Sequence, residues 1–199
     1  MHHKTTKKHN SLYDIDFARK RVFIRCDFNC PEGDDFRIQS AIPTIQHIIK
    51  QHASHIILAT HYGRPTNQQD YSTKTFLDKL EKLLNTKILF LPRGLDSTDN
   101  EDIIENGVYL MENTRYHDYE TKPKDDWFQG FYVDVFCNEA FSCSHRNHTS
   151  MTKIKAKEQC LGFCFEKEIN ALDLFKSHKN TMRKLRKMVI LGGNKIDDK

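Results

Sequence analysis

The sequence predicts an α/β protein with an open parallel sheet flanked by helices on both faces, a Rossmann-like three-layer arrangement. Two observations support this prediction: short apolar runs alternate with longer amphipathic runs, and chemically active side chains repeatedly follow the apolar runs. Strands that alternate with helical segments are typical of βαβ units and of parallel sheets covered on both faces. A chain of 199 residues, of which 38% are hydrophobic, is long enough to bury such a core.

The apolar runs predict the strands, and the amphipathic runs predict the helices. Strands are expected at residues 21–28, 55–60, 87–91, 107–111, 131–137 and 187–191. Helices are expected at residues 42–50, 74–84 and 166–175. The helix at 74–84 has apolar residues at positions 76, 77, 80, 83 and 84, which is the spacing of one helix face. Residues 92–100 and 118–126 are expected to be loops.

The chain is expected to contain four segments. Residues 1–10 are polar and basic and predict a disordered arm, whereas residues 11–165 are expected to form the main domain. Residues 166–186 are interpreted as a helix and linker between two domains. Residues 187–199 contain a strand that ends in Gly192-Gly193, and we interpret them as the beginning of a second domain.

Composition excludes several classes of protein. No apolar run is long enough to cross a bilayer, and the polar N-terminus lacks the apolar segment of a secretory signal, so we expect a cytoplasmic protein. The six cysteines form no CxxC pair, which argues against a zinc site and predicts reduced thiols in the core. The net charge of +4 fits either nucleic acid or a small polyanionic substrate.

Polar and charged side chains follow most of the expected strands. The carboxyl ends of parallel strands meet at one edge of the sheet, where ligands bind. Guanidinium groups suit phosphate and carboxylate oxygens, and each charge-assisted bond contributes about 1.5–3 kcal/mol. Four arginines from four loops therefore predict an anion site, and three or four of them together could hold a small phosphorylated acid. The residues placed at this edge are Asp27, Asn29, Arg37, His61, Arg64, Asn113, Arg115, Asn138, Glu139, His145, Arg146 and His148.

Each of these residues alone has a structural explanation. A single arginine after a strand is usually solvated or salt-bridged, Asp27 and Asn29 could cap a turn, and His61 could be a buried structural histidine. Their joint occurrence favours an anion site.

Eight motifs together resemble those of the phosphoglycerate kinases, in the same order, from about Leu12 to Lys199. They include Arg25-Cys26-Asp27-Phe28-Asn29-Cys30-Pro31, Arg37-Ile38-Gln39-Ser40-Ala41-Ile42-Pro43, His61-Tyr62-Gly63-Arg64-Pro65, Met111-Glu112-Asn113-Thr114-Arg115, Glu139-Ala140-Phe141, Ser144-His145-Arg146, Leu161-Gly162-Phe163 and Leu191-Gly192-Gly193-Asn194-Lys195. The resemblance implies the first lobe of a two-lobed, hinge-bending kinase of glycolysis. The N-terminal lobe of such an enzyme binds 3-phosphoglycerate or 1,3-bisphosphoglycerate, and its C-terminal lobe binds Mg²⁺ with ADP or ATP.

The resemblance also implies roles for individual residues. The phosphate that is not transferred should be held by His61, Arg64, Arg115 and Arg146. Asp27 and Asn29 should orient the glycerate, with Phe28, Tyr62 and Gly63 completing the substrate-binding segments. Arg37, Lys195 and Lys199 should act on the transferred phosphoryl group, and Gly192, Gly193, Lys195 and Lys199 should line the nucleotide. The resemblance assigns no metal ligand to this chain.

The chain departs from the family pattern at several positions. Cys26 and Cys30 stand for valines, Tyr62 for a leucine, Glu139 for an aspartate and Asn194 for an alanine. Ser142-Cys143-Ser144 replaces a Gly-Thr-Ala run. The sequence stops soon after the expected first strand of the nucleotide lobe, so we expect the substrate-binding half of a kinase, inactive alone.

Two other functions stay open. A non-catalytic module that binds a phosphorylated acid would keep the same site, although Lys195 and Lys199 argue against it. A nucleic-acid-binding protein would need a continuous basic face with aromatic platforms. We expect instead a monomer whose partners are the substrate and a C-terminal lobe, with neither nucleic acid nor membrane as a partner.

Overall fold

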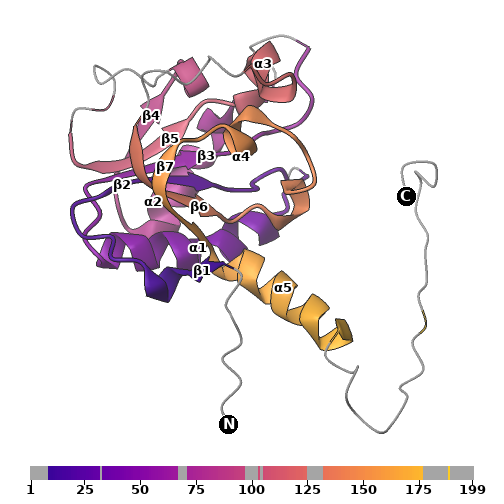
Figure 1. Ribbon diagram of the computed structural model, residues 1–199. Coiled ribbons are helices and arrows are strands. Elements are labelled where there is room, and N and C mark those ends of the chain that lie inside the picture. Colours follow the sequence, from indigo (N-terminus) through magenta and orange to yellow (C-terminus); the bar gives the residue numbers. More distant parts are fainter. Residues whose placement is uncertain are drawn as a thin grey trace, which may run out of the picture.

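The computed structural model describes residues 9–31, 33–66, 71–96, 103, 105–124, 132–176 and 188. Within these residues, parallel strands form one seven-stranded sheet in the order β1-β7-β6-β2-β3-β5-β4 (Figure 1). The predicted α/β class with an open parallel sheet is confirmed. The strands are β1 (Asn10–Ser11), β2 (Arg21–Arg25), β3 (His55–Ala59), β4 (Ile88–Leu91), β5 (Gly107–Met111), β6 (Val133–Asn138) and β7 (Ala156–Leu161).

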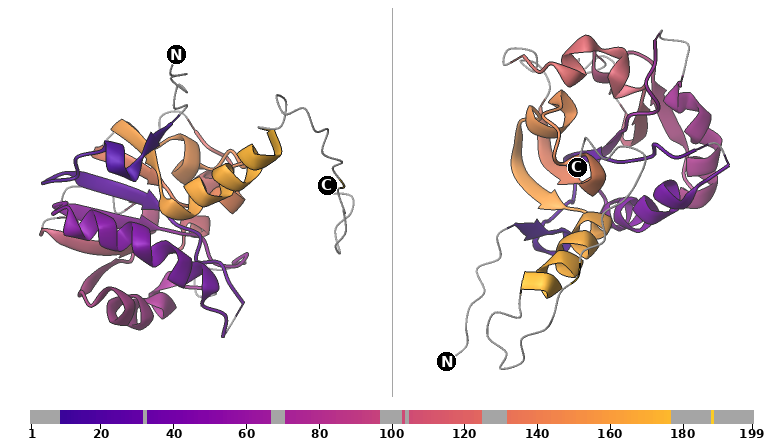
Figure 2. Two further views of the ribbon diagram at one scale, coloured as in Figure 1. Left: turned by 90° about the horizontal axis from the view of Figure 1, so that it is seen from below. Right: turned by 90° about the vertical axis from the view of Figure 1, so that its right-hand side faces the viewer.

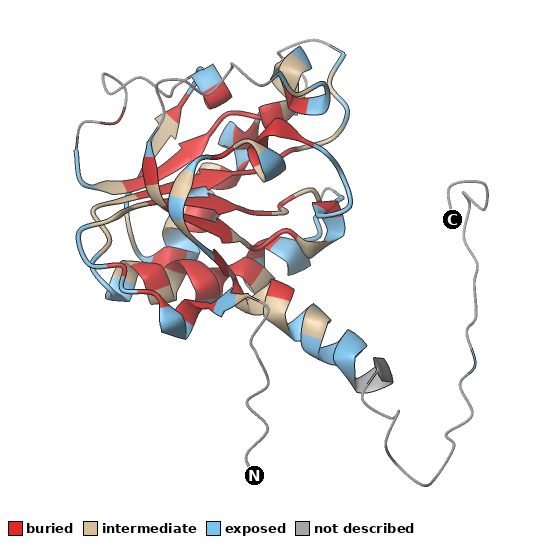
Figure 3. Cartoon of the chain, viewed as in Figure 1, coloured by how far each residue is buried: buried red, intermediate tan, exposed pale blue. Residues whose placement is uncertain are grey.

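The sheet separates two apolar layers (Figures 2 and 3). Helices α1 (Phe36–Lys50) and α2 (Leu77–Leu84) cover one face, where Ile45 of α1 joins Val22 and Ile24 of β2 in the larger core cluster. Phe23 belongs to the second cluster on the opposite face, because side chains alternate along a strand. That face is covered by loops and by the short helices α3 (Asp118–Thr121) and α4 (Thr149–Thr152).

Two helices begin earlier than the sequence predicted. Helix α1 begins at Phe36 rather than residue 42, and it continues through Pro43, whose ring is exposed to solvent. Helix α5 (Phe163–Lys176) begins at Phe163 rather than residue 166 and extends away from the sheet (Figure 1). The predicted helix at 74–84 is a 3₁₀ turn, η2 (Thr73–Phe76), followed by α2.

Both expected loops contain short helical turns. Residues 118–126 include α3, and residues 92–100 include the 3₁₀ turn η3 (Gly94–Asp96). Further 3₁₀ turns are η1 (Leu12–Asp14), η4 (Thr114–Tyr116) and η5 (Phe141–Cys143). Strands β1 and β7 were not predicted; Asn10, which was placed in the arm, pairs with Cys160 of β7. The predicted strand at 187–191 falls almost wholly outside the described residues.

The cysteines behave as expected of reduced thiols. All six lie in described segments and are unpaired, and all except Cys164 are buried. Across the described part of the chain, no helix combines the length and apolar character needed to span a membrane.

Candidate anion-binding site

Loops from several strands meet at the carboxyl edge of the sheet, around the end of the central strand β2. Strand β2 lies between β3 and β6 in the sheet. The chain continues from β2 to β3, towards the β4 edge, whereas it continues from β6 to β7, towards the β1 edge. The segments that follow β2 and β6 therefore diverge. Open α/β sheets bind ligands in the crevice that such a switch point leaves.

Asp27 joins the segments that follow β2 and β6. The hydroxyl of Ser142 donates a hydrogen bond to Oδ2 of Asp27, and the guanidinium of Arg37 forms an ion pair with the same oxygen. The N–H of Asn29 donates to Oδ1 of Asp27 over 3.2 Å. The Arg37 side chain is 44% exposed, so part of its guanidinium faces solvent at the mouth of the site.

The segment after β3 is held in place by hydrogen bonds between its backbone and the side chains of Asn29 and Arg115. The N–H of Gly63 donates to Oδ1 of Asn29 over 2.8 Å, and Arg115 donates to the carbonyl oxygen of Gly63 over 2.6 Å. Gly63 has a φ of +59°, and a Cβ added there would lie 2.4 Å from the ring of Tyr71. Glycine is therefore required both by the left-handed backbone and by the close approach of Tyr71.

A buried charge network lies beneath these loops. Arg25, at the end of β2, is fully excluded from solvent; its Nε donates to the hydroxyl of Ser150 over 2.7 Å. Glu120, also fully buried, lies 3.9 Å from Arg25 and accepts hydrogen bonds from the N–H and the hydroxyl of Ser150. Burial acts to raise the pKa of Glu120, but His148, Arg25 and Ser150 outweigh it and lower the pKa to about 2. The ionised Glu120 carboxylate thus compensates Arg25.

His61 is a neutral imidazole at the centre of the site. Burial, followed by the charges of Arg25 and Arg115, lowers its pKa to about 2. Its Nδ1 lies 3.4 Å from an amino group of Arg25, which can only donate. The proton of the neutral ring therefore sits on Nε2, where it can be donated to an anion.

Positive charge is concentrated around His61. Burial, and after it the charges of Arg146, Arg25 and Arg64, lower the pKa of Arg115. Arg64 and Arg146 are exposed, whereas Arg115 is half-buried. Like charges held this close repel one another, and a bound anion relieves that repulsion.

The side chains of two predicted site residues, Phe28 and Tyr62, pack in the apolar core. Phe28 is fully buried and packs edge-to-face against Phe76, with 6.1 Å between ring centroids. The Tyr62 ring packs on the same Phe76 at 5.0 Å. These rings support the loops from below.

The Glu139 carboxylate is bonded to the beginning of α5. Its Oε1 accepts a hydrogen bond from the N–H of Cys164 over 3.1 Å, in the first turn of α5. Burial raises its pKa to about 8. Gly192, Gly193, Lys195 and Lys199, the predicted nucleotide side of the site, lie outside the described residues.

Three residues of the network were not singled out from the sequence: Arg25, Glu120 and Ser150. The only available signal was Arg25 itself, because a charged residue inside an apolar strand must find a partner if it is buried. Nothing in the sequence indicates which residues supply that partner.

Comparison with known proteins places the chain in a family. The family model described as phosphoglycerate kinase matches residues 12–199. The chain belongs to the phosphoglycerate kinase family. It is 35% identical to the phosphoglycerate kinase of Helicobacter hepaticus, over 97% of this chain and 50% of that protein. It is 36% identical to that of Coprothermobacter proteolyticus, over 96% of this chain and 51% of that protein.

Solved structures of phosphoglycerate kinases have the same fold. The enzyme from Pyrococcus horikoshii superposes with a TM-score of 0.70 at 27% identity, covering 86% of this chain and 46% of that one. The enzyme from Coxiella burnetii gives 0.72 at 28% identity, covering 83% and 44%. The chain thus spans about half the length of the relatives that it matches.

Proposed function

We propose that this chain is the substrate-binding half of a phosphoglycerate kinase. Such an enzyme reversibly transfers a phosphoryl group between 1,3-bisphosphoglycerate and ADP, giving 3-phosphoglycerate and ATP. The observation that carries the proposal is the cluster of Arg64, Arg115 and Arg146 around the neutral His61. Family membership supports the reaction, and the cationic cluster supports the phosphorylated acid as the ligand.

Each part of the site would hold a different part of the substrate. Arg64, Arg115 and Arg146, with Nε2 of His61, would bind the phosphate that is not transferred. Asp27 would accept a hydrogen bond from the glycerate hydroxyl. Arg37, which is exposed at the mouth, would lie nearest to the carboxylate and the phosphoryl group in transfer.

Catalysis would then rest on position and charge. A carboxylate needs no strong base to attack phosphorus, so aligning it and neutralising the equatorial oxygens of the phosphoryl group lower the barrier. Mg²⁺ bound with ADP or ATP would supply further charge neutralisation from the nucleotide side of the site. Lys195 and Lys199 would also act from that side. Closure of the two lobes would exclude the water that hydrolyses an acyl phosphate. We further propose a cytoplasmic monomer.

Calorimetric titration of 3-phosphoglycerate into the chain tests the binding half of this proposal. Wild type is compared with Arg146→Gln and with Arg19→Gln, a matched charge removal before β2, at the opposite edge of the sheet. Inorganic phosphate serves as a control ligand. We expect saturable binding, stronger than that of phosphate, which Arg146→Gln weakens roughly 10- to 100-fold because it removes about 1.5–3 kcal/mol.

The two charge removals give opposite expectations. Arg19→Gln should bind like wild type. Equal losses in both variants would indicate general electrostatic attraction and contradict a built site. Turnover on addition of a nucleotide-binding half distinguishes the kinase from the alternative, a non-catalytic phospho-acid-binding module.

A further inference from the structure

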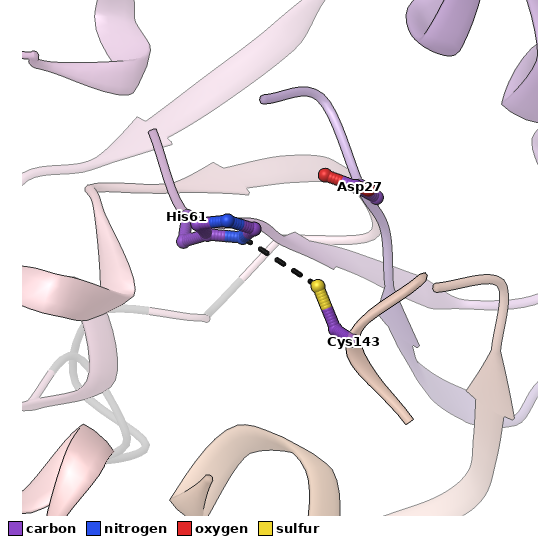
Figure 4. Close-up of side chains that lie close together, drawn as sticks. All are labelled: Asp27, His61 and Cys143. Atoms are coloured by element: carbon purple, nitrogen blue, oxygen red, sulfur yellow. Dashed lines mark hydrogen bonds between the residues drawn. The ribbon is translucent and has the colours of Figure 1, made fainter. Parts of the chain in front are cut away.

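Three side chains of different chemistry converge among the loops of the site (Figure 4): the carboxylate of Asp27, the imidazole of His61 and the thiol of Cys143. One ligand atom from each lies within 4.8 Å of the other two. Sγ of Cys143 lies 3.9 Å from Nδ1 of His61. His61 and Cys143 are buried, and the Asp27 side chain is 10% exposed.

Binding of the phosphorylated acid gives Asp27 and His61 a role but leaves Cys143 without one. A thiol is a weak hydrogen-bond donor, and a carboxylate repels a phosphate. Thiolate, imidazole and carboxylate together are instead the ligands that zinc takes in proteins.

We propose that Asp27, His61 and Cys143 bind a thiophilic divalent cation of the zinc class, and that this cation and the phosphorylated acid exclude one another. Cation binding stands on the three ligands alone. The mutual exclusion rests on the proposed function, because it requires that Asp27, a ligand of the cation, also contacts the acid.

The spacing of the ligand atoms is close to that of a metal site. Zinc bonds of about 2.0–2.3 Å in a tetrahedron place neighbouring ligand atoms roughly 3.3–3.8 Å apart. The 3.9 Å between Cys143 and His61 nearly meets this value, and the 4.8 Å limit for the three atoms leaves about an ångström of side-chain movement. Three protein ligands leave a fourth position for water, as in zinc sites that exchange ligands.

Charge both opposes and permits cation binding here. The guanidinium of Arg25 lies 3.4 Å from Nδ1 of His61, and that of Arg37 is paired with Oδ2 of Asp27, so cation binding has to displace both contacts. Arg25 stays bonded to Ser150 through Nε and to the carbonyl of Cys26 through Nη1, so its charge remains near the cation, as do the charges of Arg115 and Arg146. The Cys143 thiolate and the Asp27 carboxylate supply two negative charges to a doubly charged ion.

The sequence did not predict this site because its ligands come from three separate loops. Asp27 and Cys143 are brought together through Ser142, and 82 residues separate His61 from Cys143 along the chain. The paired spacing that identifies a zinc motif in a sequence is absent.

Cadmium tests the site, because a cadmium–thiolate bond gives an ultraviolet charge-transfer band to which histidines do not contribute. We compare wild type with Cys143→Ser, with Asp27→Asn and with the matched control Cys164→Ser, a thiol of α5 outside the cluster. We expect one equivalent of the band in wild type and in Cys164→Ser, and its loss in Cys143→Ser. Asp27→Asn should bind at least roughly tenfold more weakly, and zinc should displace the cadmium.

A band that persists in Cys143→Ser would overturn the site, as would its absence from folded wild type. The exclusion is tested by repeating the titration with saturating 3-phosphoglycerate, after correction for cadmium that the acid chelates in buffer. An unchanged cadmium affinity with the acid bound would contradict the exclusion. Failure of the acid to bind even the metal-free chain would refute the proposed function instead, leaving the cation site intact.

Discussion

Asn113 and Tyr62 exchange two hydrogen bonds across the carboxyl edge of the sheet. The N–H of Tyr62 donates to Oδ1 of Asn113 over 3.2 Å, and Nδ2 of Asn113 donates to the carbonyl of Tyr62 over 2.6 Å. Nδ2 also donates to the carbonyl of Tyr71 over 2.9 Å, and Oδ1 accepts from the N–H of Arg115 over 3.1 Å. One fully buried amide thus holds the backbone at Tyr62 and at Tyr71, before and after Gly63 and Arg64 in the chain.

We predict that Asn113→Ala destabilises the protein and weakens binding of the acid together. Removing the amide leaves four partly buried backbone groups unpaired, at about 1–3 kcal/mol for each group that water cannot reach. Urea unfolding should show a loss of at least about 2 kcal/mol, and calorimetry should show weaker binding of 3-phosphoglycerate. Asn147→Ala, which removes one exposed hydrogen bond to Thr152, is the control. A loss no larger than in that control would contradict the bracing role of Asn113.

The second prediction concerns the Arg25–Glu120 pair and the stability of the protein at low pH. Glu120→Gln should cost about 3–5 kcal/mol at neutral pH, because it leaves the buried Arg25 without a compensating charge. The folded pKa of Glu120, about 2, lies below the ordinary value of 4.5. Its contribution is therefore fully present above about pH 4.5 and is lost as pH falls towards 2.

Urea unfolding between pH 7 and pH 3 checks this prediction. The stability difference between wild type and Glu120→Gln should shrink as the pH falls below 4.5. Glu158→Gln, which removes a partly exposed ion pair with Lys20, should change stability little at any pH. A difference between wild type and Glu120→Gln that stays constant across this range would contradict the conclusion that ionised Glu120 compensates Arg25.

Glu139 should give the opposite pH dependence. Its folded pKa of about 8 lies above the ordinary 4.5, so the folded state holds this proton more tightly than the unfolded state. Stability from this group therefore falls as the pH rises from about 4.5 to 8. Glu139→Gln mimics the protonated acid and should remove the fall, making the variant more stable than wild type at pH 8 by a few kcal/mol at most. Thermal unfolding at pH 6 and pH 9 measures this, and identical shifts in both proteins would refute it.

The central strands could be predicted because they are buried on both faces and read as short apolar runs. Residues 107–111 form β5 as predicted, and the strand at 55–60 differs from β3 by one residue. Strand β7 escaped prediction because Lys157 and Glu158 interrupt its apolar character. Among the described strands its outer neighbour is the two-residue β1, so much of β7 stays partly exposed.

The candidate site could be predicted only as far as residue type and strand ends allow. Arg64, Arg115 and Arg146 follow strands, so their meeting at one edge was expected from a parallel sheet. The roles of Arg25 and Cys143 depend on which loops touch, and this is decided by the strand order. A local pattern carries no information about that order.

The bonds that build the site join residues far apart in the chain: 34 residues separate Asn29 from Gly63, 115 separate Asp27 from Ser142, and 125 separate Arg25 from Ser150. During synthesis, which proceeds from the N-terminus, strands β2 and β3 leave the ribosome long before the segment after β6 exists. A nascent chain that ends before α4 lacks Ser150, and so cannot complete the network beneath the loops. The proposed anion site is therefore complete only after nearly all of the described sheet has been made.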